Sequence, residues 1–198
     1  HTHTHADEHA HEHGEMDPHV WQDPLRAIAQ AQRIASALIA ADPEGREEYR
    51  ANADRLIRDL RSLHSDFQDA LGSCTHREFV VSHAAYGYLA LRYGLEQIYV
   101  AGLSPDVEPS PRRLAQIASL VDELGIDVIL VEPALSGSVV RTLARETGAE
   151  VLPIHPLGTV TEQELADHED FLGLMRDTLS SLRIAMKCGA SPDTRSTE

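Results

Sequence analysis

Three side chains that can bind a metal each follow a short apolar run. His83 follows FVVS, Glu132 follows DVILV and His155 follows EVLPI. Each run is typical of a buried strand, and strands that alternate with helical segments form parallel sheets. Ligands of such sheets bind at the carboxyl ends of the strands. The sequence therefore predicts that these three side chains share one edge of a sheet and contribute to a metal site.

The two residue types have different roles at such a site. Imidazole nitrogen suits zinc, whereas a carboxylate can either bind the metal or hold a ligand histidine by a hydrogen bond. We expect His83 and His155 to bind directly and Glu132 to hold a histidine. Asp106, in the loop SPDVEPSP, is a further carboxylate at a strand end, with a solvated loop as the alternative. A purely structural histidine remains the alternative for His83 and His155.

Another isolated histidine, His19, lies in the segment DPHVWQDP. It stands between two Asp-Pro turns and just before a helix start. Its position makes it a candidate ligand, and the spacing by itself favours the alternative, a surface histidine in a turn.

The start of the chain is rich in histidine. Six of the 12 histidines lie in the first 13 positions, and no apolar periodicity accompanies them. Alternating imidazoles in a flexible segment bind zinc, nickel or copper weakly, because ordering the segment costs entropy. We expect residues 1–15 to be a disordered loop that loads metal as an accessory, with a solvated loop as the alternative; residues 189–198 are expected to be a disordered tail. The histidines concerned are His1, His3, His5, His9, His11 and His13.

The segments that must position these side chains alternate between helix and strand. A helix starts where Asp23 can cap it and Pro24 takes its first position. Asp42-Pro43 restarts the helix, and an amphipathic pattern then continues to Gly72. We expect this second pattern to form one amphipathic helix of about 28 residues that could act as a rigid strut. Strands are expected at 78–82, 97–101, 127–131 and 150–154, and helices at 83–93, 110–125, 138–147 and 169–187.

Composition and motifs exclude several classes of function. The formal net charge of −15 argues against binding to nucleic acid or to anionic membranes, and it favours cations. No apolar run approaches about 18 residues, so no transmembrane helix is expected. The hydrolase motifs G-x-S-x-G and H-E-x-x-H are absent, and we expect no enzyme activity.

The chain has two cysteines, Cys74 and Cys188. Their number and spacing do not suit a zinc site made of thiolates. They could form a disulfide that closes a loop of about 115 residues, or they could be two free structural thiols. The residues alone leave both alternatives open.

Several segments, taken together and in this order, resemble the ABC-transporter solute-binding proteins that capture zinc or manganese, and within them the zinc group. The resemblance covers residues 16–188. The segments that carry it are the His-rich stretch, DPHVWQDP at 17–24, the long helix, SHAAYGYLALRYGLEQ at 82–97, SPDVEPSPRRL at 104–114, LVEPALS at 130–136, HPLG at 155–158 and DFLGLMRDTL at 170–179.

This resemblance implies an α/β fold of two lobes joined by a long helix, with metal bound in the cleft between them. Residues 16–24 would end the N-terminal lobe, 24–72 would be the linking helix, and 74–188 would be a C-terminal lobe with a parallel sheet. The rest of the N-terminal lobe, with one histidine ligand, would precede His1.

The resemblance also implies the ligands. His19 and His83 match ligand positions by motif. His155 stands where relatives usually carry an Asp, so it is either a nitrogen ligand in place of that Asp or a sign that Asp106 supplies the carboxylate. A histidine at position 83, where manganese-type relatives tend to carry a carboxylate, favours zinc.

The function implied is extracytoplasmic zinc capture by a monomer that delivers the metal to an ABC permease membrane subunit, with a periplasmic zinc chaperone as a further partner. The location would be the periplasm or the cell surface, with a lipid anchor on the full-length protein. That oxidising setting favours the disulfide between Cys74 and Cys188. The alternative function is a surface adhesin or zinc-scavenging interaction protein on the same fold.

Overall fold

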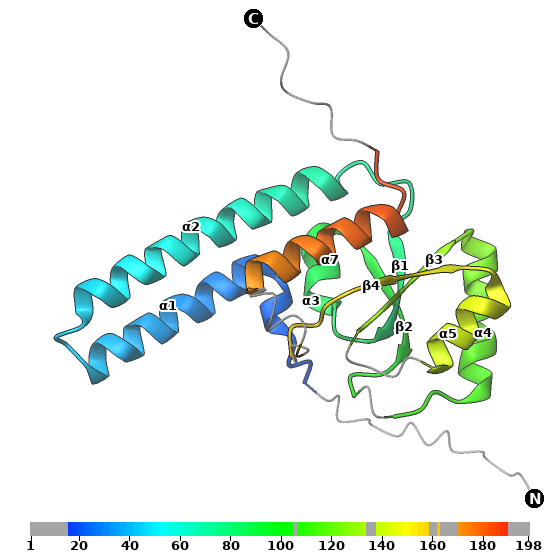
Figure 1. Ribbon diagram of the computed structural model, residues 1–198, viewed down its shortest axis with the longest axis horizontal. Coiled ribbons are helices and arrows are strands. Elements are labelled where there is room, and N and C mark those ends of the chain that lie inside the picture. Colours follow the sequence, from blue (N-terminus) through cyan, green and yellow to red (C-terminus); the bar gives the residue numbers. More distant parts are fainter. Residues whose placement is uncertain (1–15, 105–106, 134–137, 159–161, 163–169, 190–198) are drawn as a thin grey trace, which may run out of the picture.

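A parallel sheet of four strands lies at the centre of the larger part of the molecule (Figure 1). The computed structural model describes residues 16–104, 107–133, 138–158, 162 and 170–189. The strand order is β2-β1-β3-β4, and every neighbouring pair is parallel. The strands are β1 (Glu78–His83), β2 (Glu96–Ala101), β3 (Val128–Val131) and β4 (Glu150–Pro153). All four lie where the sequence predicted them, within one residue at either end.

Alternate residues of the strands face two separate apolar clusters. Val80 and Ile129 belong to the cluster beneath helices α4 (Pro111–Leu124) and α5 (Ser138–Thr147). Val81 and Leu130 belong to the other cluster. That cluster also contains residues of helices α2 (Arg46–Leu71), α3 (Gly87–Tyr93) and α7 (Phe171–Ala185). Because successive side chains of a strand point to opposite faces, the apolar runs that mark these strands are explained by burial on both faces.

Two more helices cover the second face of the sheet. Helix α3 (Gly87–Tyr93) ends at Gly94, which adopts a left-handed conformation with φ of 63°. Helix α7 (Phe171–Ala185) begins after Asp170, whose carboxylate accepts from the Gly173 N–H at 2.7 Å. The helix expected at 83–93 starts four residues late, because the backbone N–H groups that precede it bond to Gly102, His83 and the Gln97 side chain.

The resemblance implied a single linking helix over residues 24–72, and this is wrong: the chain breaks where Asp42-Pro43 was predicted to restart the helix. That segment forms two helices, α1 (Pro24–Ala41) and α2 (Arg46–Leu71), which run antiparallel as a hairpin that projects from the sheet (Figure 1). Asp42 leaves the helical conformation, and its carboxylate accepts from the Glu44 and Gly45 N–H groups and from the Tyr49 hydroxyl. These contacts reverse the direction of the chain. The apolar patterns of the two helices do not indicate in which direction the second helix runs relative to the first.

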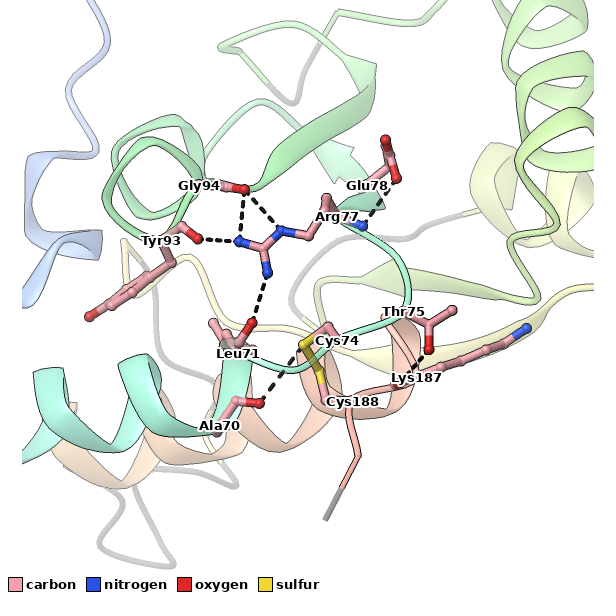
Figure 2. Close-up of a disulfide and its surroundings, with 10 residues drawn as sticks. All are labelled: Ala70, Leu71, Cys74, Thr75, Arg77, Glu78, Tyr93, Gly94, Lys187 and Cys188. Atoms are coloured by element: carbon pink, nitrogen blue, oxygen red, sulfur yellow. Dashed lines mark hydrogen bonds between the residues drawn. A yellow bond between two sulfur atoms is a disulfide. The ribbon is translucent and has the colours of Figure 1, made fainter. Parts of the chain in front are cut away.

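A disulfide joins the ends of α2 and α7 (Figure 2). Cys74 follows α2 and Cys188 follows α7, and beside them the Thr75 N–H donates to the Lys187 carbonyl. Of the two alternatives open for the cysteines, the disulfide is therefore confirmed. The bond fastens the hairpin to the last helix of the sheet layer.

Arg77 binds the ends of two helices beside this disulfide (Figure 2). Its guanidinium donates to the Leu71 carbonyl at 2.8 Å, to the Tyr93 carbonyl at 2.6 Å and to the Gly94 carbonyl at 2.9 Å. The last carbonyls of a helix lack partners within the helix and carry its partial negative charge. A single cation therefore satisfies carbonyls at the ends of both α2 and α3.

Among the described helices, none is long and apolar enough to cross a membrane.

Candidate metal centre

The ends of two neighbouring strands bring His83 and Glu132 into contact. His83 is the last residue of β1, and Glu132 directly follows β3, which pairs with β1 through Val81 and Leu130. Both side chains are buried, with exposed fractions of 3% and 2%. The Nδ1 atom of His83 forms a short hydrogen bond with Oε1 of Glu132.

This contact determines which ring nitrogen of His83 faces outward. A carboxylate beside Nδ1 favours the tautomer that carries its hydrogen there, because the N–H can then donate to it. The lone pair is left on Nε2, and this is the arrangement in which a carboxylate orients a metal-binding imidazole. The Ser82 hydroxyl donates to the same Oε1 atom at 2.6 Å.

His19 lies against His83 and has a carboxylate of its own. The centroids of the two rings are 5.3 Å apart, and the ring planes meet at 67°. Nδ1 of His19 lies 2.8 Å from Oδ1 of Asp17, which also accepts the His19 backbone N–H. The structure thus places two imidazoles side by side, each with a carboxylate on its Nδ1 atom. Sequence reasoning missed Asp17, although an Asp two residues before a histidine in a proline turn is a usable signal.

Helix α3 holds the segment that carries His19. The guanidinium of Arg92 makes a two-pronged ion pair with the Asp23 carboxylate, at 2.7–3.0 Å, and Asp23 also caps α1. The Tyr88 hydroxyl donates to the Asp17 carbonyl at 3.3 Å, and Arg26 lies over the Tyr88 ring. The Asp23 hydrogen bonds raise the pKa of Arg92. Residues 17–23 are therefore fixed on the lobe that carries His83.

The backbone around His155 reaches the same segment. The Gln22 side-chain amide donates to the His155 carbonyl at 3.1 Å, and the Trp21 indole donates to the Pro156 carbonyl at 2.8 Å. Trp21 in turn packs edge-on against His19, with ring centroids 5.5 Å apart. The backbone of residues 155 and 156 is thus bonded to the segment that carries His19, and His19 lies beside His83.

The described residues nevertheless contain no group of three or more His, Cys, Asp or Glu side chains arranged to hold a metal ion. A ligand role for His155 therefore stays a prediction, and the pair His19 and His83 is the part of the site that the structure assembles. Asp106 and the six histidines of the His-rich loop lie outside the described residues, as do the loop at 1–15 and most of the tail at 189–198.

A buried phenol lies near Glu132. The Tyr86 ring is fully buried, and within the described part of the chain its hydroxyl has no hydrogen-bond partner. Burial raises the pKa of Tyr86 well above its usual range, and the Glu132 carboxylate raises it further. Tyr86 therefore stays neutral and adds no negative charge to the centre.

Residues 1–185 match the family model described as ZnuA, the periplasmic component A of a zinc-uptake complex. The chain belongs to the ZnuA family. The α/β fold with a parallel sheet, and the family expected from its motifs, are therefore confirmed. The family is one of uptake components and not of enzymes, as the sequence predicted.

Known members of the ZnuA family and solved structures are similar over most of this chain. A zinc-binding protein AdcA of Streptococcus pyogenes serotype M6 is 40% identical over 184 residues, which are 93% of this chain and 36% of AdcA. A zinc-binding lipoprotein AdcA of Streptococcus pneumoniae strain R6 is 38% identical over 181 residues, 91% of this chain and 36% of that protein. The chain thus spans about a third of the length of these relatives.

Two solved structures have the same fold. The Zn(II)-bound ZnuA-like domain of Streptococcus pneumoniae AdcA matches with a TM-score of 0.76 and 36% identity, over 88% of this chain and 66% of that one. The laminin-binding protein Lmb of Streptococcus agalactiae, described as having adhesin and metal-transporting activity, matches with a TM-score of 0.75 and 30% identity. That match covers 86% of this chain and 64% of Lmb.

Proposed function

We propose that this chain binds Zn²⁺ outside the cytoplasm and belongs to a protein that delivers it to an ABC permease. The observation that carries the proposal is the pair of imidazoles at His19 and His83. Each has a carboxylate on Nδ1, so that both Nε2 lone pairs are available, and neutral imidazole is a common zinc ligand. The similarity to a Zn(II)-bound domain supports zinc as the metal.

His155 is proposed as a further ligand, since its backbone is bonded to the segment that carries His19. Asp106 is the alternative donor. A zinc site with tetrahedral geometry needs four ligands, and a further histidine from the N-terminal lobe would complete the set. The His-rich loop would load metal as an accessory, by raising its concentration near the centre.

The division of the chain follows from the same proposal. Residues 16–24 would end the N-terminal lobe, and the hairpin of α1 and α2 would take the place of the single linking helix between the lobes. Residues 74–188 would form the C-terminal lobe. The protein would be a monomer in the periplasm or, by analogy with the AdcA lipoprotein, anchored at the cell surface by lipid. A periplasmic zinc chaperone would be a further partner.

The first test of zinc binding is His83→Ala. Removal of one nitrogen ligand should weaken zinc binding by more than about tenfold, because a coordinating bond is lost and Glu132 is left without its partner. The measurement is a competition titration against a chromogenic chelator. His76→Ala, which changes a histidine beside the disulfide, is the matched control and should leave the affinity unchanged. An unaltered affinity in His83→Ala would remove His83 from the site.

The structural neighbour Lmb favours a second candidate function, adhesion to an extracellular protein. The same chain would then present a binding surface as well as a metal site. Surface plasmon resonance against immobilised laminin, with zinc and with chelator, distinguishes the two. Zinc binding without laminin binding would exclude the adhesin function.

A further inference from the structure

Glu132 is a buried carboxylate that accepts two hydrogen bonds on one of its oxygen atoms. Its exposed fraction is 2%, and Oε1 accepts both from Nδ1 of His83 and from the Ser82 hydroxyl at 2.6 Å. Burial of a carboxylate is costly unless hydrogen bonds replace its water. Ser82 is thus part of what makes this carboxylate stable beneath the metal centre.

The Ser82 hydroxyl is the second donor to this carboxylate, and its position on the strand is well defined. Its hydroxyl is buried, with an exposed fraction of 4% for the residue, and it stands one position before His83 at the end of β1. The single torsion between the backbone and the oxygen of a serine leaves the hydroxyl only a few staggered positions, and in this structure it occupies the one that reaches Glu132. Because the two donors come from consecutive residues of one strand, they hold Oε1 at a set position relative to the His83 ring.

We propose that Ser82 is a positioning residue for zinc capture. Its hydroxyl holds the Glu132 carboxylate against Nδ1 of His83, and this contact keeps the Nε2 lone pair directed outward. The inference rests on the proposed zinc-binding function. Without the hydroxyl, the carboxylate is free to rotate about its own side-chain torsions, and both the orientation and the tautomer of His83 become less well defined.

The experiment compares Ser82→Ala with Ser82→Thr, which restores a hydroxyl at the same atom. Two properties of the intact chain are measured: zinc affinity by chelator competition, and the ¹⁵N chemical shifts of the His83 ring in the metal-free state, which report its tautomer. Ser181→Ala, which alters another buried serine in α7, is the matched control. Denaturant unfolding of each variant establishes that it is folded.

Ser82→Ala should weaken zinc binding by about three- to tenfold, somewhat less than the loss of a residue that contacts the ligand itself. It should also reduce the fraction of His83 with hydrogen on Nδ1, and Ser82→Thr should restore both properties. In a Glu132→Gln background the serine change should have no further effect, since it acts through that carboxylate. Ser181→Ala should change neither zinc affinity nor the ring shifts.

Two results would overturn the inference: an unchanged affinity and tautomer in folded Ser82→Ala, or an equal further loss when Ser82→Ala is added to Glu132→Gln. If Ser82→Ala does not fold, the test compares Ser82→Thr with the unaltered chain. A His83 tautomer in Ser82→Thr that differs from that of the unaltered chain would then overturn the inference. Failure of the unaltered chain to bind zinc would be a failure of the proposed function, which this design detects separately.

Discussion

Two carboxylates, Asp17 and Glu132, face the Nδ1 atoms of His19 and His83. The two pairs differ in burial: the side chain of Asp17 is 24% exposed, whereas that of Glu132 is 3% exposed. Water can therefore take over part of the hydrogen bonding of Asp17 to His19, but it reaches the buried contact of Glu132 with His83 less easily. At the scale of single residues, the imidazoles supply the lone pairs and the carboxylates decide where those lone pairs point.

Asp17→Asn should weaken zinc binding by about tenfold, at the lower end of the range for partners of metal-binding histidines, because Asp17 is partly exposed. The change removes the charge that holds the His19 N–H. Chelator competition gives the affinity, and the exposed Asp54→Asn on α2 serves as control. An affinity within twofold of the unaltered chain would show that His19 needs no carboxylate.

Zinc affinity should fall as the pH is lowered from about 8 to about 5, because a protonated imidazole has no lone pair for the metal. The slope of log affinity against pH counts the protons that zinc displaces. Chelator competition at several pH values measures this affinity. An affinity that stays the same between these pH values would contradict coordination by imidazole.

At the scale of elements, helix α3 joins the hairpin to the sheet. Arg92 on α3 pairs with Asp23 at the start of α1, and Arg77 binds the carbonyls at the ends of α2 and α3. The side chain of Asp23 is 2% exposed, so its charge has little water around it. This ion pair therefore helps to hold the segment that carries His19 beside His83.

Arg92→Met should lower the free energy of unfolding by about 2 kcal/mol, because the buried Asp23 carboxylate loses the nearer of its two charged partners and keeps only Arg26 at 3.5 Å. It should also weaken zinc binding, since the segment with His19 is released from α3. Urea denaturation and chelator competition measure the two effects, with the exposed Arg58→Met on α2 as control. A variant that loses stability but keeps its zinc affinity would separate the ion pair from the metal centre.

At the scale of the whole molecule, the disulfide is a covalent link between distant parts of the chain. It joins residues 114 positions apart and lies at the far ends of α2 and α7, beside Arg77 (Figure 2). In the sequence, all four strands of the parallel sheet lie between the two cysteines. The bond therefore restricts the unfolded chain strongly, and it links the end of α2 to α7, whereas Arg92 links the start of α1 to α3.

The double variant Cys74→Ser/Cys188→Ser should lose roughly 4–5 kcal/mol of stability, the entropy of closing a loop of about 115 residues. Denaturant unfolding with and without reductant measures it. Reductant should lower the midpoint of the unaltered chain toward that of the variant and should leave the variant unchanged. A midpoint that does not respond to reductant would show that the disulfide contributes little in solution.

Much of the fold follows from local patterns in the sequence. The four strands, the cap at Asp23 and the proline at the first position of α1 were all predicted, because each depends on a few adjacent residues. The parallel sheet followed from the alternation of helices and strands, which leaves few other connections. His83 and Glu132 were predicted at one edge of the sheet for the same reason.

Only the tertiary structure decided the rest. The break at Asp42 was predicted, but the direction in which α2 returns follows from its packing against α1. The ion pair of Arg92 with Asp23 depends on a contact between distant segments, and no periodicity encodes it. The same holds for Asp17, whose role appears only when His19 is seen beside His83. The sequence by itself determined which histidines stand at the ends of elements. Which of them meet was set by packing, since hydrogen bonds and ion pairs between distant residues fix distances that local propensity does not.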